Sequence, residues 1–186
     1  MRRRRITVRW PALCAALAIL GVMLVATPAF GAYVQYDRNG ITTGFLRLEP
    51  AGWRAGSGQV KDACQVGRGW LPTGWYDSRG HWNNYDSTIK GRVFWVSDKQ
   101  CQYGTWRTEL FIHTEETSTT GQYCPTSGDD PYCWEGDFDY ESNGCIKIKQ
   151  PNYDMYHFHN WWHDKFGASL HGDYPNINNN LWVNGV

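Results

Sequence analysis

Two residues of this 186-residue chain have side chains that could together perform nucleophilic chemistry, the thiol of Cys145 and the imidazole of His113. A thiol becomes a useful nucleophile when a neighbouring base accepts its proton or a nearby dipole favours the thiolate. Gly144, directly before the cysteine, permits a tight turn that exposes the sulfur and lets backbone amides converge on a developing oxyanion. These residue types would suit nucleophilic catalysis by a cysteine, although their separation along the chain is not specific.

The number of cysteines also singles out Cys145. Six are encoded, and one of them lies in an N-terminal segment that we expect to be removed, which leaves five. Cysteines of exported proteins tend to pair, so an odd number leaves one thiol free. Cys124 and Cys133 flank a turn-rich segment that a disulfide could close, and Cys64 would then pair with Cys101 by elimination. The sequence alone does not fix this connectivity. The alternative is that Cys145 is a structural thiol or half of another disulfide.

The N-terminal residues have the pattern of a secretory signal. Five arginines within positions 2–9 precede an apolar run over 12–26, and small residues follow at 29–32. The run is shorter than the ~20 residues of a membrane-spanning helix, so we predict a cleaved signal peptide over 1–31 and no stable membrane anchor afterwards. Without these arginines the 18 basic and 18 acidic residues become about 5 net negative charges. This charge argues against a nucleic-acid partner, and the signal predicts a secreted, extracytoplasmic protein.

The remaining residues should form one mainly β domain, because Gly, Asn, Asp, Trp and Tyr are abundant and long helical runs are absent. Residues 32–58 are weakly patterned, and we set them apart as an N-terminal segment before a domain over 59–186. Alternation predicts strands at 74–76, 89–97 and 106–113. Residues 144–149 are a further short strand or the turn into a helix, and 181–183 are a last strand after an Asn-rich turn over 176–180. Pro151 and Gly167 bound one predicted helix over about 152–166.

The sequence around these residues resembles the catalytic signature of the L,D-transpeptidases, the YkuD-type domain. The signature is carried by Ile112-His113-Thr114, then by Ser142-Asn143-Gly144-Cys145-Ile146-Lys147-Ile148, and then by a helix. The family has a His at a strand end, followed downstream by Ser/Thr-His-Gly-Cys, an aliphatic residue, Arg and another aliphatic residue. Upstream, Leu71-Pro72-Thr73-Gly74-Trp75-Tyr76 is similar to the family's Thr-Pro-x-Gly-x-Phe strand. The resemblance spans roughly residues 59–166 and implies a β-sandwich or barrel-like sheet with one helix after the cysteine.

The resemblance also implies a role for each matching position. Cys145 would be the nucleophile and His113 its general base, oriented by a small residue at Thr114. The turn that begins at Ser142 would supply an oxyanion hole from the backbone N–H groups of Asn143, Gly144 and Cys145. Lys147 replaces the family's arginine and would contact substrate, keeping the charge but not the fork geometry. Asn143 replaces a histidine and cannot take a proton, so activation of the thiol would depend on His113 alone.

The function that the resemblance implies is acyl transfer on peptidoglycan stem peptides. The Cys145 thiolate would attack a stem-peptide carbonyl, and the acyl-enzyme would pass to an amine or, in L,D-carboxypeptidase activity, to water. We expect a monomer that needs no metal or organic cofactor. One alternative is a catalytically silent wall-binding module, since eleven Trp and eleven Tyr could stack on sugar rings. Another is a secreted cysteine peptidase or amidase.

Two further groups of titratable residues invite an interpretation. Glu115 and Glu116 follow the candidate base, and if they lie near His113 they would raise its pKa and favour an imidazolium–thiolate pair. His159 and His163 are spaced as two ligands on one helical turn. A metalloprotease helix would carry Glu at Asn160, which this chain lacks. We therefore interpret these histidines as part of a solvated helix face and predict no metal.

Overall fold

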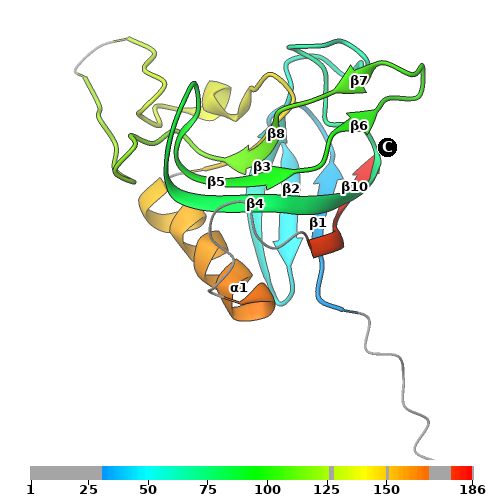
Figure 1. Cartoon of the computed structure of the whole chain (residues 1–186). Helices are drawn as coiled ribbons and strands as arrows, with labels where there is room; N and C mark the ends of the chain where they lie inside the picture. The colour runs from blue at the N-terminus through cyan, green and yellow to red at the C-terminus, as the bar shows by residue number, and fades with distance from the viewer. Residues whose placement is uncertain (1–30, 126–127, 150, 168–176, 186) are drawn as a thin grey trace, which may run out of the picture. The chain divides into compact units, whose positions relative to one another are not determined.

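A computed structural model describes residues 31–125, 128–149, 151–167 and 177–185, which form a mainly β domain (Figure 1). The predicted signal peptide lies outside the described residues except for Gly31. The strands are β1 (Val34–Arg38), β2 (Gly44–Leu48), β3 (Ala51–Ser57), β4 (Gly74–Asp86), β5 (Lys90–Val96), β6 (Lys99–Gln100), β7 (Trp106–Arg107), β8 (Leu110–His113), β9 (Ile146–Ile148) and β10 (Ile177–Gly185). The helical elements are η1 (Asp137–Tyr140), η2 (Pro151–Met155) and α1 (Tyr156–Phe166).

Eight of the strands close into a barrel in the order β1-β10-β4-β5-β8-β9-β3-β2. Neighbours are antiparallel except for β1 with β10 and β8 with β9, which run parallel. The short strands β6 and β7 form a separate two-stranded sheet. The prediction of a mainly β fold with a barrel-like sheet is confirmed, and within the described residues the one α-helix follows Cys145.

The barrel core follows from the two-residue period of its strands. In β2, for example, Leu46 and Leu48 are buried whereas Phe45 and Arg47, which alternate with them, are exposed. Successive side chains of a strand point to opposite faces, so one set from every strand fills the interior. Helix α1 adds Phe158 to this core, where its ring meets Phe94 of β5 at a centroid distance of 4.9 Å. The helix ends before Gly167, as predicted, in a left-handed residue at φ +99°.

Three sequence-based boundaries differ from the structure. The N-terminal segment over 32–58 supplies β1, β2 and β3, so it is part of the barrel and does not precede it. Residues 177–180 of the predicted Asn-rich turn begin β10 instead, where the Asn180 side chain accepts the backbone N–H of Ser78. The single strand predicted over 106–113 is broken because Glu109 takes a left-handed conformation at φ +55°, which separates β7 from β8.

Both predicted disulfides are present. Cys64 pairs with Cys101 and Cys124 with Cys133, and Cys145 is the one free cysteine in the described part of the chain. Disulfides persist in oxidising compartments, so the pairing agrees with a location outside the cytoplasm. A search for long apolar helices among the described residues finds none that could span a bilayer.

Candidate active site

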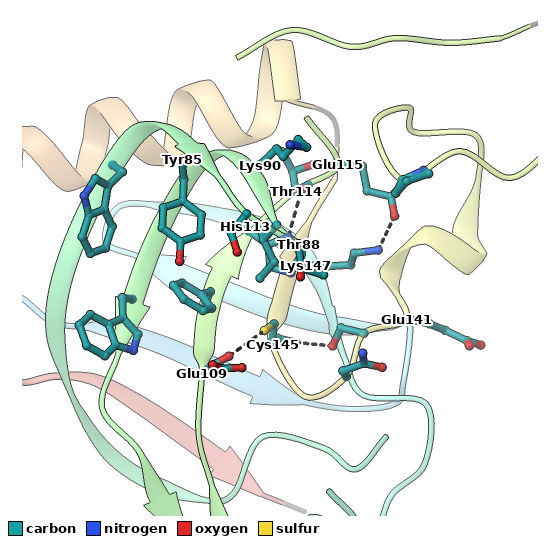
Figure 2. A pocket seen from close by; sticks show the side chains of 18 of the residues that line it. Tyr85, Thr88, Lys90, Glu109, His113, Thr114, Glu115, Glu141, Cys145 and Lys147 are labelled. Atoms are coloured by element: carbon teal, nitrogen blue, oxygen red, sulfur yellow. Dashed lines mark hydrogen bonds and ion pairs between the residues drawn. The ribbon is translucent and has the colours of Figure 1, made fainter. Parts of the chain in front are cut away.

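The parallel pairing of β8 with β9 brings His113 and Cys145 to the same face of the barrel. Ile112 is opposite Ile146 in the register and His113 is opposite Lys147, two residues beyond the cysteine. The two isoleucines are buried in the barrel core, so alternation directs His113 and Cys145 to the other face. Strand spacing and rise place their Cα atoms about 8 Å apart. Both side chains line one cavity of about 740 Å³ (Figure 2).

Ser142 holds the turn that presents the cysteine. Its Oγ accepts the backbone N–H groups of Gly58, at 2.9 Å, and Gly144, at 3.1 Å, and donates to the carbonyl of Cys145 at 2.6 Å. The Gly144 amide is therefore engaged within the turn. An oxyanion hole would have to use the amides of Asn143 and Cys145, or displace this hydrogen bond.

Gly144 is required here for two independent reasons. Its φ of +120° lies in a region that other residues rarely adopt, and a Cβ at this position would approach Nη2 of Arg107 to 2.1 Å. The turn therefore depends on close approach of its backbone to the Arg107 guanidinium. The sequence-based expectation of a tight turn at Gly144 agrees with this geometry, but it gave no indication of the arginine.

Arg107 is a buried cation that joins the cysteine turn to the segment before β4. Its side chain is bound to backbone only, and its four acceptors are the carbonyl oxygens of Ala63, Gly69, Trp70 and Asn143, at 2.6–3.1 Å. Its charge also acts to lower the pKa of Cys145. Sequence reasoning missed Arg107 because its partners come from distant loops with no motif of their own.

The Cys145 thiol is buried and protonated in this state. Its Sγ lies 3.7 Å from the Glu109 carbonyl, to which the S–H can donate, and the backbone N–H of Phe111 donates to the sulfur. Burial raises the pKa of Cys145 to about 11, although the Phe111 hydrogen bond and the charges of Lys147 and Arg107 lower it in part. The left-handed conformation of Glu109 thus places a carbonyl oxygen beside the nucleophile.

His113 is a neutral imidazole whose Nδ1, and not Nε2, contacts the backbone. Its Nδ1 lies 2.9 Å from the Thr114 carbonyl, and a carbonyl only accepts, so Nδ1 carries the hydrogen and Nε2 the lone pair. This is the contact that the resemblance assigns to Thr114. Burial, followed by the nearby charge of Lys147, lowers the pKa of His113 to about 3. A neutral imidazole is the form that can accept a proton.

The prediction that Glu115 and Glu116 raise the pKa of His113 is wrong. Glu115 forms an ion pair with Lys147, and Glu116 pairs with Arg92 through Nη2 at 2.5 Å and the backbone N–H at 2.6 Å. Each carboxylate is thus matched to a cation, and the pKa of His113 is lowered instead of raised. The site therefore holds a thiol and a neutral imidazole, without a resting imidazolium–thiolate pair.

The chain was compared with protein families, curated proteins and solved structures. No protein-family model, curated protein or solved structure matches the chain. The chemistry of the cavity therefore has to be argued from its own residues.

Lys147, expected to contact substrate, lies in the cavity wall with its Nζ engaged by Glu115. Its positive charge lowers the pKa of both reactive groups, His113 and Cys145.

The cavity wall opposite Lys147 is aromatic. It is formed by side chains of β4, β5 and β8, namely Trp82, Tyr85, Trp95 and Phe111. This wall has no counterpart in the sequence-based assignment, because the residues that form it read as ordinary strand positions.

A cation could be held at either of two groups within the described residues, one acidic and one composed of histidines. The acidic group is Glu115, Glu135 and Asp139. Its members have partners within the protein. Glu115 binds Lys147, Asp139 accepts the backbone N–H groups of Glu135 and Gly136, and the Glu135 carboxylate accepts the backbone N–H of Asp130. These contacts explain the acidic group as a structural feature that surrounds the start of η1.

Proposed function

We propose that the chain is a secreted cysteine acyltransferase that acts on peptidoglycan stem peptides, with a YkuD-type domain like that of the L,D-transpeptidases. One observation carries the proposal: His113 at the end of β8 and Cys145 directly before the parallel strand β9 line one cavity, with the lone pair of the imidazole on Nε2. The two disulfides support an extracytoplasmic location, where such a substrate is found.

In the proposed reaction the thiol proton of Cys145 moves to Nε2 of His113 as the sulfur attacks a stem-peptide carbonyl. The tetrahedral oxyanion is held by backbone N–H groups of the turn, and it collapses by breaking the C–N bond to the terminal D-residue. His113 returns the proton to that leaving amine. The remaining thioester passes its acyl group to an acceptor amine or to water, and the thiol is restored.

The resting protonation states make this proton transfer dependent on substrate. The pKa of Cys145 is about 11 and that of His113 about 3, a gap that corresponds to ~11 kcal/mol for forming the separated charges. The charges of Arg107 and Lys147 are already contained in these two pKa values, so what recovers part of this energy is the attraction between the thiolate and the imidazolium. The rest has to come from bond formation to the carbonyl, so proton transfer and attack occur together.

The experiment is incubation of the protein with purified muropeptides, with products identified by mass. We expect exchange or loss of the terminal D-residue in wild type, no product in Cys145→Ala, and about 10²- to 10⁴-fold slower turnover in His113→Asn. A carbapenem should add its mass to wild type and not to Cys145→Ala. Turnover that persists in Cys145→Ala would refute the mechanism. Cleavage of a different peptide bond, with water as the acceptor throughout, would indicate the peptidase or amidase alternative.

The aromatic wall of the cavity favours a second candidate, a non-catalytic module that binds the cell wall. The Tyr85 ring contacts those of Trp82 and Phe111, at centroid distances of 5.5 and 5.7 Å, and such an aromatic wall could stack on sugars or other flat groups. This candidate predicts tight binding to isolated peptidoglycan by both wild type and Cys145→Ala. It also predicts the absence of a carbapenem adduct.

A further inference from the structure

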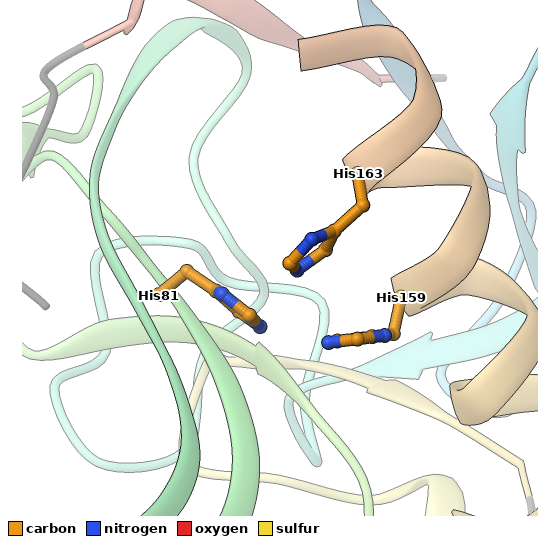
Figure 3. A group of neighbouring side chains, drawn as sticks. All are labelled: His81, His159 and His163. Atoms are coloured by element: carbon orange, nitrogen blue, oxygen red, sulfur yellow. The ribbon is translucent and has the colours of Figure 1, made fainter. Parts of the chain in front are cut away.

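Three imidazoles from two distant parts of the chain converge between β4 and α1. His81 belongs to β4, and His159 and His163 are one turn apart on α1 (Figure 3). One ligand nitrogen from each lies within 4.8 Å of the other two. The ring centroids of His159 and His163 are 4.2 Å apart, and they lie 5.0 and 4.9 Å from the His81 ring.

The fold fixes this convergence on the core side of the barrel. His81 is opposite Phe94 in the β4–β5 register, is fully buried, and stacks on the Phe94 ring at 4.4 Å. The α1 histidines are half-buried and face it, so the interpretation of His159 and His163 as part of a solvated helix face is wrong. The next residue of β4, Trp82, lines the Cys145 cavity. The histidines and that cavity therefore lie on opposite faces of β4.

We propose that His81, His159 and His163 form a binding site for a divalent transition-metal ion of the Zn²⁺ type. Neutral imidazoles are the nitrogen ligands that Zn²⁺ prefers, at about 2.0–2.1 Å, and tetrahedral ligands at that distance are ~3.4 Å apart. Nitrogens already within 4.8 Å reach this geometry by movements of about 1 Å, which side-chain rotation supplies. Three protein ligands leave a fourth position, as in open zinc sites.

Asn83 supplies a polar group at the edge of this site. It lies two residues beyond His81 on β4, and its Oδ1 is 2.8 Å from Nε2 of His159. The β4–β5 register is irregular between Trp82 and Tyr85, and such an irregularity can turn a side chain toward a neighbouring element. The amide oxygen can complete the coordination or bind a water in the fourth position. An ion at this place would fasten α1, which follows β9 in the chain, to β4, the longest strand of the barrel.

The proposal is tested by titrating untagged protein with Zn²⁺ in a calorimeter and by measuring Tm with and without the ion. We expect one ion per chain and a Tm increase of several degrees at about a hundredfold excess over Kd. His159→Gln and His163→Gln should each weaken binding by about tenfold or more and abolish the Tm increase. His157→Gln, on the exposed side of the same helix, and Cys145→Ser should both behave as wild type.

A second measurement does not depend on the variants. Co²⁺ added to wild-type protein should give the intense visible absorption of a tetrahedral nitrogen site, and Zn²⁺ should displace it. The pale spectrum of hydrated Co²⁺ would overturn the proposal, as would an unchanged Zn²⁺ affinity in both helix variants. Loss of binding in Cys145→Ser alone would also overturn it, because the thiol would then be the ligand. These outcomes are independent of acyltransferase activity.

Discussion

The ionisation of Cys145 is the property of the candidate site that can be measured most directly. The protein is treated with iodoacetamide over a range of pH, and the fraction of Cys145 alkylated is followed by mass. Only the thiolate reacts, so the rate at each pH reports the thiolate fraction. Because burial raises the pKa of this thiol to about 11, we expect the rate to rise steadily through the alkaline range without a plateau near neutrality.

The magnitude follows from the two ionisation constants. At about pH 8 an ordinary thiol of pKa 9.0 is roughly 9 % thiolate, whereas a thiol of pKa about 11 is roughly 0.1 %. Alkylation of Cys145 should therefore be on the order of 100-fold slower than that of a model thiol, before any steric protection is counted. The disulfide-bonded cysteines do not react, so one adduct is the expected maximum for the chain without its predicted signal peptide, which holds the sixth cysteine.

Charge variants separate the electrostatic part of this effect from simple burial. Lys147→Met removes a positive charge that lowers the pKa of Cys145, so its alkylation should be slower still at every pH. Lys147→Arg keeps the charge and is the matched control. An apparent pKa below about 8 in wild type would refute the reasoning, because it would require a stable imidazolium–thiolate pair in the resting protein.

The remaining predictions concern stability, measured by urea denaturation. The pKa of His113 is about 3 in the folded protein and 6.5 ordinarily, so its contribution to the free energy of unfolding is present above pH 6.5 and is lost as pH falls toward 3. At about pH 4.5 the loss should be on the order of 2–3 kcal/mol. The difference in free energy of unfolding between wild type and His113→Gln should shrink by that amount. Gly144→Ala should cost about 3–5 kcal/mol, from backbone strain and displacement of the Arg107 guanidinium, whereas Gly104→Ala, with φ +85° and open space around it, should cost about 1 kcal/mol; equal costs would contradict the contact with Arg107. Replacing both cysteines of the Cys64–Cys101 pair by Ala should cost about 4 kcal/mol, and the shorter Cys124–Cys133 loop about 3 kcal/mol, with the reverse order arguing against loop entropy as the cause.

The features that the sequence predicted are those set by local chemistry or by counting. An odd number of cysteines and a turn-rich segment were enough to pair Cys124 with Cys133 and to leave Cys145 free. The two-residue period indicated a β protein, and Pro151 and Gly167 bounded the helical segment. Each of these signals lies within a few neighbouring residues, where the physical cause and its effect share the same stretch of chain.

The features that the sequence did not predict depend on long-range register. The left-handed conformation of Glu109 has no local signature, because glutamate rarely adopts a positive φ. Arg107 acts through carbonyl groups, which every residue has, so no side-chain motif indicates its partners. His81 reads as one polar residue in an aromatic strand. It meets His159 only because β4 and α1 are brought together by the barrel core.

The closure of the barrel by its first and last strands has a kinetic consequence. β10 pairs with β1 on one side and with β4 on the other, so two of the eight seams form only after Gly185 has been synthesised. Contacts that join such distant residues are slow to form, because loop closure is unfavourable until the pairing is complete. The long edge of β4 stays open during that interval and could pair with other chains. Refolding should therefore be slow and sensitive to protein concentration, with aggregation competing against the final step.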